Sequence, residues 1–427
     1  MRDLVRRIDH ATPPGRDRAV DALRALAILG VVLGHWLVTA LVADSGTVHG
    51  AGPLQHMPQL IPISWLFQTL AVFFLVGGHV GARSYASARA QGVPYGQWVG
   101  ARMARLFRPV AAVLTVWTVA SVAMLVSGVG PETVHTLLKL VLSPLWFLLV
   151  FAGLTAATPL VARLHPLWPL AVVLHVDLIR FGLGDPGRSD WLGHLGLLGG
   201  LGWIGWIGWL NVAAGWLVPY CLGTLWARGG PHGRRTGWTL LLGGTAATTA
   251  LVLWAGYPAS MVGVPGAAIS NLDPPTLAAV TFGLAQCGAA LLLLGPLRRV
   301  LRRPVAWAAV ALVNLSAMTV FLWHQTAMIA VTAVGLFAAG VLPGLHTVPD
   351  GSGWVLARVA WLPVFAVALL VCWGTFRTYE QRRPAPHGRT SRTGRAGTVP
   401  SRTGIVRGRT ESVPAQRPAP ERTSRHV

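Results

Sequence analysis

The stretch "RDRAVDALRALAILGVVLGHW", Arg16 to Trp36, begins with charged residues and continues as an apolar run. About 20 apolar residues are enough to cross the ~30 Å hydrocarbon core of a bilayer as a helix, so this stretch predicts a membrane helix. Asp21 and Arg24 stand near its start, and His35 lies deep inside the apolar part. Ionisable side chains at membrane depth are costly and are candidates for function, so the position of His35 needs an explanation.

The rest of the chain resembles this stretch in composition. Of its 427 residues, 53% are hydrophobic and only 11% are charged, whereas a soluble chain carries about a quarter charged residues. Ten candidate spans follow one another, at 20–43, 60–82, 108–127, 137–157, 166–182, 198–226, 238–256, 276–295, 308–338 and 354–376. The sixth and ninth are long enough to tilt or break. The prediction is an all-α polytopic membrane protein, a bundle of about ten transmembrane helices.

The arginines alternate between loops, which predicts the topology. They cluster in the N-terminal segment, in every second loop and in the C-terminal tail. The other loops hold Arg188 alone; these are 44–59, 128–136, 183–197, 257–275 and 339–353. Cytoplasmic loops carry the basic excess, so we expect a multi-pass plasma-membrane protein with both termini inside. The net charge of +21 does not indicate nucleic acid binding, because no basic run is interleaved with aromatic residues.

Three regions are predicted: a cytoplasmic segment over 1–19, a transmembrane domain over 20–376 and a disordered cytoplasmic tail over 377–427. The tail is rich in Arg, Pro, Ser, Thr and Gly, a composition that cannot bury a core. Each of the three cysteines lies inside an apolar run, and their spacing matches no metal site. We therefore expect no metal ion and no bound cofactor.

Helical geometry relates Arg24 to His35. Eleven residues at 100° each amount to three turns plus about 20°, so the two side chains share one helical face, roughly 16 Å apart along the axis. Asp21 lies within about 40° of that face. The face is suited to one long ligand entering from the cytoplasm. The alternative is that Asp21 and Arg24 reach to the interface and His35 bonds a neighbouring carbonyl.

The Arg–ten residues–His pattern in a first helix resembles the acyltransferase 3 family of integral membrane acyltransferases. Other segments resemble the family in the same order along residues 16–376: "VFFLVGG" (Val72 to Gly78), "ARMARLFRP" (Ala101 to Pro109), "LWFLLVF" (Leu145 to Phe151), "SNLDPPTL" (Ser270 to Leu277) and "MTVFLWHQTAM" (Met318 to Met328). The chain departs from the family at Gly77, Gly78 and His79, where a Ser-Gly-aromatic step is usual. The role of His79 stays open.

The resemblance implies transfer of an acyl group, such as acetyl, from acyl-CoA to a hydroxyl of a carbohydrate, glycolipid or secondary metabolite. A histidine suits the task of taking the hydroxyl proton, because its ordinary pKa is near 6.5, and we assign this role to His35. His324 is a candidate second acid or base, or a structural residue. The remaining candidates are substrate-binding residues. Arg102 and Arg105 are expected to bind the phosphates of CoA. Arg24 and Asp21 either contact the pantetheine arm or pair with each other, and Trp146 is expected to form part of the wall of the substrate pocket.

Two other classes of function remain open from the sequence. A secondary transporter also buries charged residues near the midplane, although no paired half-chain repeat is visible. A membrane scaffold without chemistry is the other alternative. Asp177 and Arg180, three residues apart on one helical face, are expected to neutralise each other.

Overall fold

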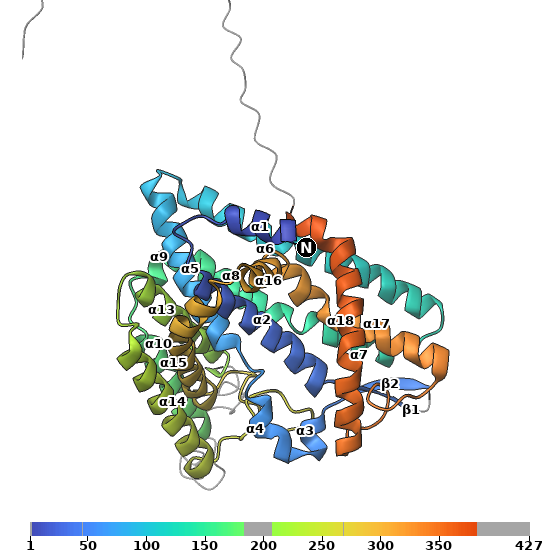
Figure 1. The fold of residues 1–427 in the computed structure, drawn as a ribbon. Helices are drawn as coiled ribbons and strands as arrows, with labels where there is room; N and C mark the ends of the chain where they lie inside the picture. Colours follow the sequence, from blue (N-terminus) through green and yellow to red (C-terminus); the bar gives the residue numbers. More distant parts are fainter. Residues whose placement is uncertain (1, 45, 183–206, 268, 382–427) are drawn as a thin grey trace, which may run out of the picture. The chain divides into compact units, whose positions relative to one another are not determined.

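The computed structural model describes residues 2–44, 46–182, 207–267 and 269–381; most of these residues are helical, and their strands form one two-stranded sheet (Figure 1). The elements are α1 (Arg2–His10), α2 (Arg18–Val38), β1 (Ala40–Asp44), β2 (Thr47–Ala51), α3 (Pro53–His56), the 3-10 helix η1 (Pro58–Leu60), α4 (Ile61–Ser64), α5 (Leu70–Ala90), α6 (Tyr95–Val126), α7 (Pro131–Leu142), α8 (Leu145–Ala156), α9 (Thr158–Val161), α10 (Leu167–Gly182), α13 (Leu210–Ala227), α14 (Arg234–Trp254), α15 (Leu277–Val300), α16 (Pro304–Leu315), α17 (Ala317–Ala339) and α18 (Ser352–Gln381).

The start of α2 is fixed by Asp17. Its carboxylate accepts a bond from the backbone N–H of Ala19 at 3.1 Å, as an N-cap does, and a second bond of 2.6 Å from Arg298 at the end of α15. Burial of Asp17 disfavours its charged form, but the bond and charge of Arg298 together with the backbone bonds at the cap hold the pKa of Asp17 below its ordinary value. The cap therefore anchors α2 to α15 as well as starting the helix.

The end of α2 differs from the prediction. The helix stops at Val38, and Thr39 has extended backbone angles, so the predicted span 20–43 is too long at its end. Residues from Ala40 onward form β1, which pairs antiparallel with β2. Valine, alanine and threonine fit a strand as well as a helix of this length, and the long-range partners of the hairpin decide between the two.

Each of the ten predicted spans contains helix, and eight helical segments in the described residues are long and apolar enough to cross a membrane. Those eight do not include α5, whose second half carries Arg83 and Arg89, or the short α10. The count of ten is therefore approximate. As expected for a long span, the ninth breaks, at Ser316 between α16 and α17. The fourth also divides, at Ser143 between α7 and α8. The last helix, α18, continues five residues past 376, and the rest of the tail lies outside the described residues.

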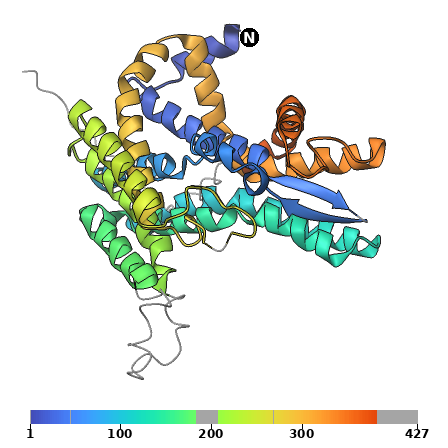
Figure 2. The same ribbon diagram turned by 90° about the horizontal axis from the view of Figure 1, so that it is seen from below.

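The helix α2 lies between two groups of helices. Figures 1 and 2 show α13, α14 and α15 on one side of it and α17 and α18 on the other, and α2 packs directly against α5, α15, α16 and α17. The helices α5 and α13 approach each other closely. A Cβ atom at Gly78 would collide with the Tyr220 carbonyl, and one at Gly223 with the Leu75 carbonyl, so small residues let these two backbones touch. On α2 itself, Leu26 and Leu29 are exposed, whereas Arg24 and His35 are partly buried.

The loops fall into two groups that match the predicted alternation of arginines. At one end, the N-terminal segment meets the loop after α15, where Arg18 donates to the Leu301 carbonyl at 3.2 Å. The arginine-poor loops contact one another elsewhere: Val48 with Thr133, Gln55 with Pro265, and Ala43 with His346. The predicted outer loops thus come together in three dimensions, with loop 183–197 outside the described residues.

Candidate active site

A cavity of about 520 Å³ opens beside the first half of α2. Four arginines line it, Arg16, Arg24, Arg102 and Arg105, and none of the described residues of its lining carries a carboxylate. The remaining wall is mostly apolar and aromatic, contributed by α5, α6, α8 and α17; it includes Phe73, Val76, Leu106, Phe147, Phe151, Met318 and Phe321. A basic mouth joined to an apolar chamber fits an elongated ligand with an anionic head.

Arg24 is held by Asn314, a residue that the sequence analysis did not single out. Arg24 Nε donates to Asn314 Oδ1 at 2.6 Å, and Nη2 donates to the Asn314 carbonyl at 3.2 Å. Asn314 Nδ2 in turn donates to the backbone carbonyls of Asp21 and Val310 at 2.8 and 3.0 Å. Asn314 is buried and lines the cavity. The one feature of the sequence that could have indicated Asn314 is that its polar amide stands within an apolar run.

Asp21 holds Arg16. Its two carboxylate oxygens accept bonds from Arg16 Nε at 2.5 Å and Nη2 at 3.1 Å. This bond and the charge of Asp21 raise the pKa of Arg16 above its ordinary value. Asp21 itself is absent from the residues that line the cavity, whereas its partner Arg16 is among them.

Arg102 and Arg105 both line the cavity, as a pair one turn apart on α6 allows. The Arg102 guanidinium lies 5.1 Å from the centre of the Trp98 ring, which supports it from one side. The segment from Arg16 to Arg24 and this turn of α6 therefore place four arginines around one cavity, although the two segments are far apart in the chain.

Trp146 does not line the cavity. It is 37% exposed, and its ring packs against Phe147 and Trp216 with centroid distances of 6.3 and 6.2 Å. Its neighbour Phe147 lines the wall, together with Phe151 one turn later. The sequence analysis proposed Trp146 as wall, and the structure places Phe147 in the cavity lining instead, because the sequence alone does not define which face of α8 is turned inward.

The structure brings His35 and His324 together, although 289 positions separate them. His324 Nε2 lies 2.9 Å from His35 Nδ1, and the rings stack with centroids 5.0 Å apart. His324 Nδ1 lies 2.6 Å from the carbonyl of Phe321. His324 is fully buried, whereas His35 keeps part of its surface exposed. The Phe321 ring lines the cavity and lies 6.1 Å from the His324 ring, so the pair stands just behind the cavity wall.

The hydrogen bonds assign the protons of this pair. A carbonyl oxygen accepts only, so His324 Nδ1 carries a hydrogen and donates to Phe321. In neutral His324, Nε2 is then an acceptor, and the hydrogen between the rings belongs to His35 Nδ1. His35 Nε2 is left with an unshared electron pair. In this arrangement His35 Nε2 is the unprotonated ring nitrogen, and the bond to His324 holds the His35 ring in that tautomer.

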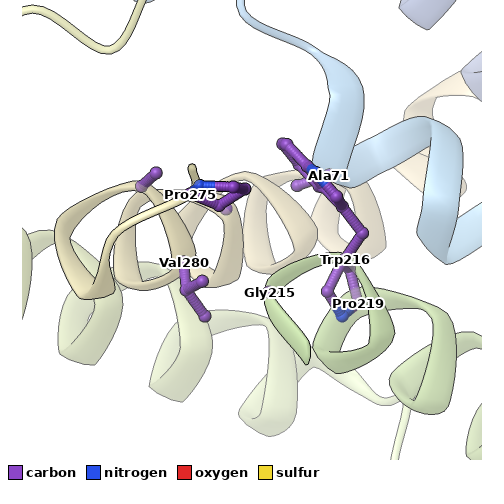
Figure 3. A pocket seen from close by; sticks show the side chains of 8 residues that line it. Ala71, Gly215, Trp216, Pro219, Pro275 and Val280 are labelled. Atoms are coloured by element: carbon purple, nitrogen blue, oxygen red, sulfur yellow. The ribbon is translucent and has the colours of Figure 1, made fainter. Parts of the chain in front are cut away.

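Two other features of the interior lie apart from this site. His79 is buried and stacks on Trp226 at a centroid distance of 3.8 Å; it is absent from the cavity lining, although its neighbours Val76, Gly77 and Val80 belong to it. A cavity of about 10 Å³ lies between α5, α13 and α15 (Figure 3), bounded by Ala71, Trp216, Pro275 and Val280 among others. It has room for about one water molecule, which is too small for a substrate.

Asp177 and Arg180 do pair, with Arg180 Nη1 3.6 Å from Asp177 Oδ1. The Asp177 carboxylate has shorter bonds from Asn211, Tyr257 and the backbone N–H of Leu277, at 2.9, 3.1 and 2.6 Å. It thus fastens the loop before α15 to α10 and α13, which is a structural role. In the described part of the chain no three His, Cys, Asp or Glu side chains gather as a metal site would require.

Fold and cavity together define a multi-pass helical membrane protein with an arginine-lined cavity beside a histidine pair. The family model described as an acyltransferase domain, of the acyltransferase 3 family, matches residues 17–377, and the chain belongs to this family. The protein is therefore a membrane acyltransferase, as the resemblance of its motifs indicated. No curated protein and no solved structure matches the chain.

Proposed function

We propose that the protein transfers an acyl group from acyl-CoA to a hydroxyl of a carbohydrate, glycolipid or secondary-metabolite acceptor, with His35 as general base. The observation that carries this proposal is one cavity that four arginines line, with the His35–His324 pair next to Phe321 of its wall. Phosphate and pyrophosphate bind well to guanidinium groups, and the apolar chamber suits a pantetheine arm.

In the proposed reaction, His35 Nε2 takes the proton of the acceptor hydroxyl while its oxygen attacks the thioester carbonyl carbon. The bond from His35 Nδ1 to His324 Nε2 keeps the ring oriented and stabilises the imidazolium that forms. The carbon–sulfur bond then breaks, the acceptor oxygen keeps the acyl group, and the proton of His35 returns to the sulfur of CoA. Acyl-CoA is a substrate here, and the mechanism uses no bound cofactor.

The test of this function is a balance of donor and product. Membranes or proteoliposomes containing the protein are given acyl-CoA labelled in the acyl group, and extracts of surface glycans, glycolipids and secreted metabolites from a deletion strain serve as acceptors. We expect release of free CoA and a gain in mass of one acyl group in a single class of acceptor. The deletion strain should contain the acceptor of this class only in its unacylated form. Movement of an unmodified solute without consumption of acyl-CoA would instead identify a transporter.

We also propose that the protein lies in the plasma membrane, with both termini and the arginine-lined cavity on the cytoplasmic side. The N-terminal segment, the tail and every second loop carry the arginines, as cytoplasmic segments do, and acyl-CoA is made in the cytoplasm. With the three native cysteines replaced by alanine, Thr47→Cys is expected to react with a membrane-impermeant maleimide in intact cells. Arg302→Cys and a tail variant, Ser391→Cys, are expected to react only after permeabilisation. Labelling of the tail in intact cells would contradict this topology.

A further inference from the structure

Arg358, near the start of α18, is a buried cation whose bonds all go to neutral groups. Its side chain is 1% exposed. Its Nε donates to the Trp36 carbonyl at 2.6 Å, Nη2 to the Thr39 carbonyl at 2.6 Å, and Nη1 to the Gly344 carbonyl at 2.9 Å. A buried charge is costly without compensating bonds, so a guanidinium that meets carbonyls, a thioether and aromatic rings calls for a reason.

The reason lies in what those carbonyls belong to. Trp36 and Thr39 are in the last turn and at the C-cap of α2, where carbonyl oxygens have no partner within the helix. The same end carries the negative pole of the helix, which favours a cation. Arg358 therefore completes the end of α2, directly after His35, and ties it to α18 and to the loop at Gly344.

A second bond connects this end of α2 with the other histidine. The Trp36 indole Nε1 donates to the backbone carbonyl of His324 at 3.0 Å. Trp36 is buried, and its ring packs on Phe365 at 5.5 Å, while the Arg358 guanidinium lies 4.7 Å from the Phe365 ring centre. Arg358 thus holds the peptide of Trp36, and Trp36 holds the backbone of His324.

We propose that Arg358 is a positioning residue of the acyl transfer: through Trp36 it sets the separation of α2 and α17 at which His35 Nδ1 meets His324 Nε2. The inference rests on the proposed role of His35 as base. It adds a residue on the last described helix, 323 positions beyond His35, that never touches substrate. Errors of about 1 Å in the placement of a catalytic group can lower turnover by about 10²-fold.

The test compares Arg358→Met, which keeps an unbranched apolar stem but loses the charge and all donors, with Arg358→Lys, which keeps the charge. We expect Arg358→Met to lower kcat by about 10²-fold with the KM for acyl-CoA near the parent value, and Arg358→Lys to recover part of the loss. Amide hydrogen exchange over residues 33–40 is expected to rise in Arg358→Met. The matched control is Asp177→Asn, another buried charge with several partners, which should lower thermal stability but change neither kcat nor that exchange.

A double variant separates positioning from general damage. If Arg358 acts through the histidine pair, Arg358→Met should lower kcat much less in a His324→Ala background than in the parent. An equal loss in both backgrounds, an unchanged kcat in Arg358→Met, or an equal loss of kcat in the Asp177→Asn control would each overturn the inference. Failure of the proposed role of His35 is a different result, namely an active His35→Gln variant. That variant keeps the native Arg358, so the two failures are distinguishable.

Discussion

His35→Gln is expected to remove most turnover, by roughly 10²–10⁴-fold, the usual contribution of a general base. Glutamine has a similar volume, and its amide N–H can replace the bond to His324 Nε2, so the packing of α2 against α17 should survive. It cannot take a proton at neutral pH, and the free electron pair of His35 Nε2 is lost with the ring. Turnover with saturating acyl-CoA and acceptor, at matched abundance in the membrane, is the measurement.

The control for this substitution is His79→Gln. It exchanges another buried histidine of a membrane helix for the same residue, but His79 contacts Trp226 and is absent from the cavity lining. We expect His79→Gln to keep its activity and both variants to bind acyl-CoA. If His35→Gln stays active, a hydrogen bond alone is sufficient at this position, and His324 becomes the candidate for the proton transfer.

Arg102→Ala combined with Arg105→Ala is expected to raise the KM for acyl-CoA strongly and to leave the dependence on acceptor nearly unchanged. Each hydrogen bond to a charged phosphate contributes about 1.5–3 kcal/mol, so the loss of even one corresponds to at least about a tenfold change. The measurement is initial rate against acyl-CoA concentration at fixed acceptor. High salt should weaken the parent more than the double variant, because exposed charges are screened.

Arg108→Ala supplies the matched control for the two arginines. It removes an arginine from the next turn of α6, and Arg108 is absent from the residues that line the cavity. Its KM for acyl-CoA is expected to stay at the parent value. An unchanged donor KM in the Arg102 and Arg105 double variant would leave these two residues with a role in topology alone.

Much of the fold follows from local properties of the chain. Apolar runs of membrane length become helices because the backbone must satisfy its hydrogen bonds internally in lipid, and each of the ten predicted spans contains helix. The period of the helix places Arg24 and His35 on one face of α2 without any tertiary information. The order of short motifs was sufficient to indicate the family that the comparison shows.

Tertiary structure decided the rest, because partners far apart in the chain carry no mutual signal in a single sequence. The contact of His35 with His324, the support of Arg24 by Asn314 and the cap of α2 by Arg358 each join residues about 290 to 320 positions apart. Which face of α8 turns inward, and so why Phe147 rather than Trp146 lines the cavity, depends on helix packing. The sequence by itself determined where helices form and which polar residues lie at membrane depth; only the packing of those helices decided which of these residues meet, because a side chain's partner is set by the surface against which its helix is pressed.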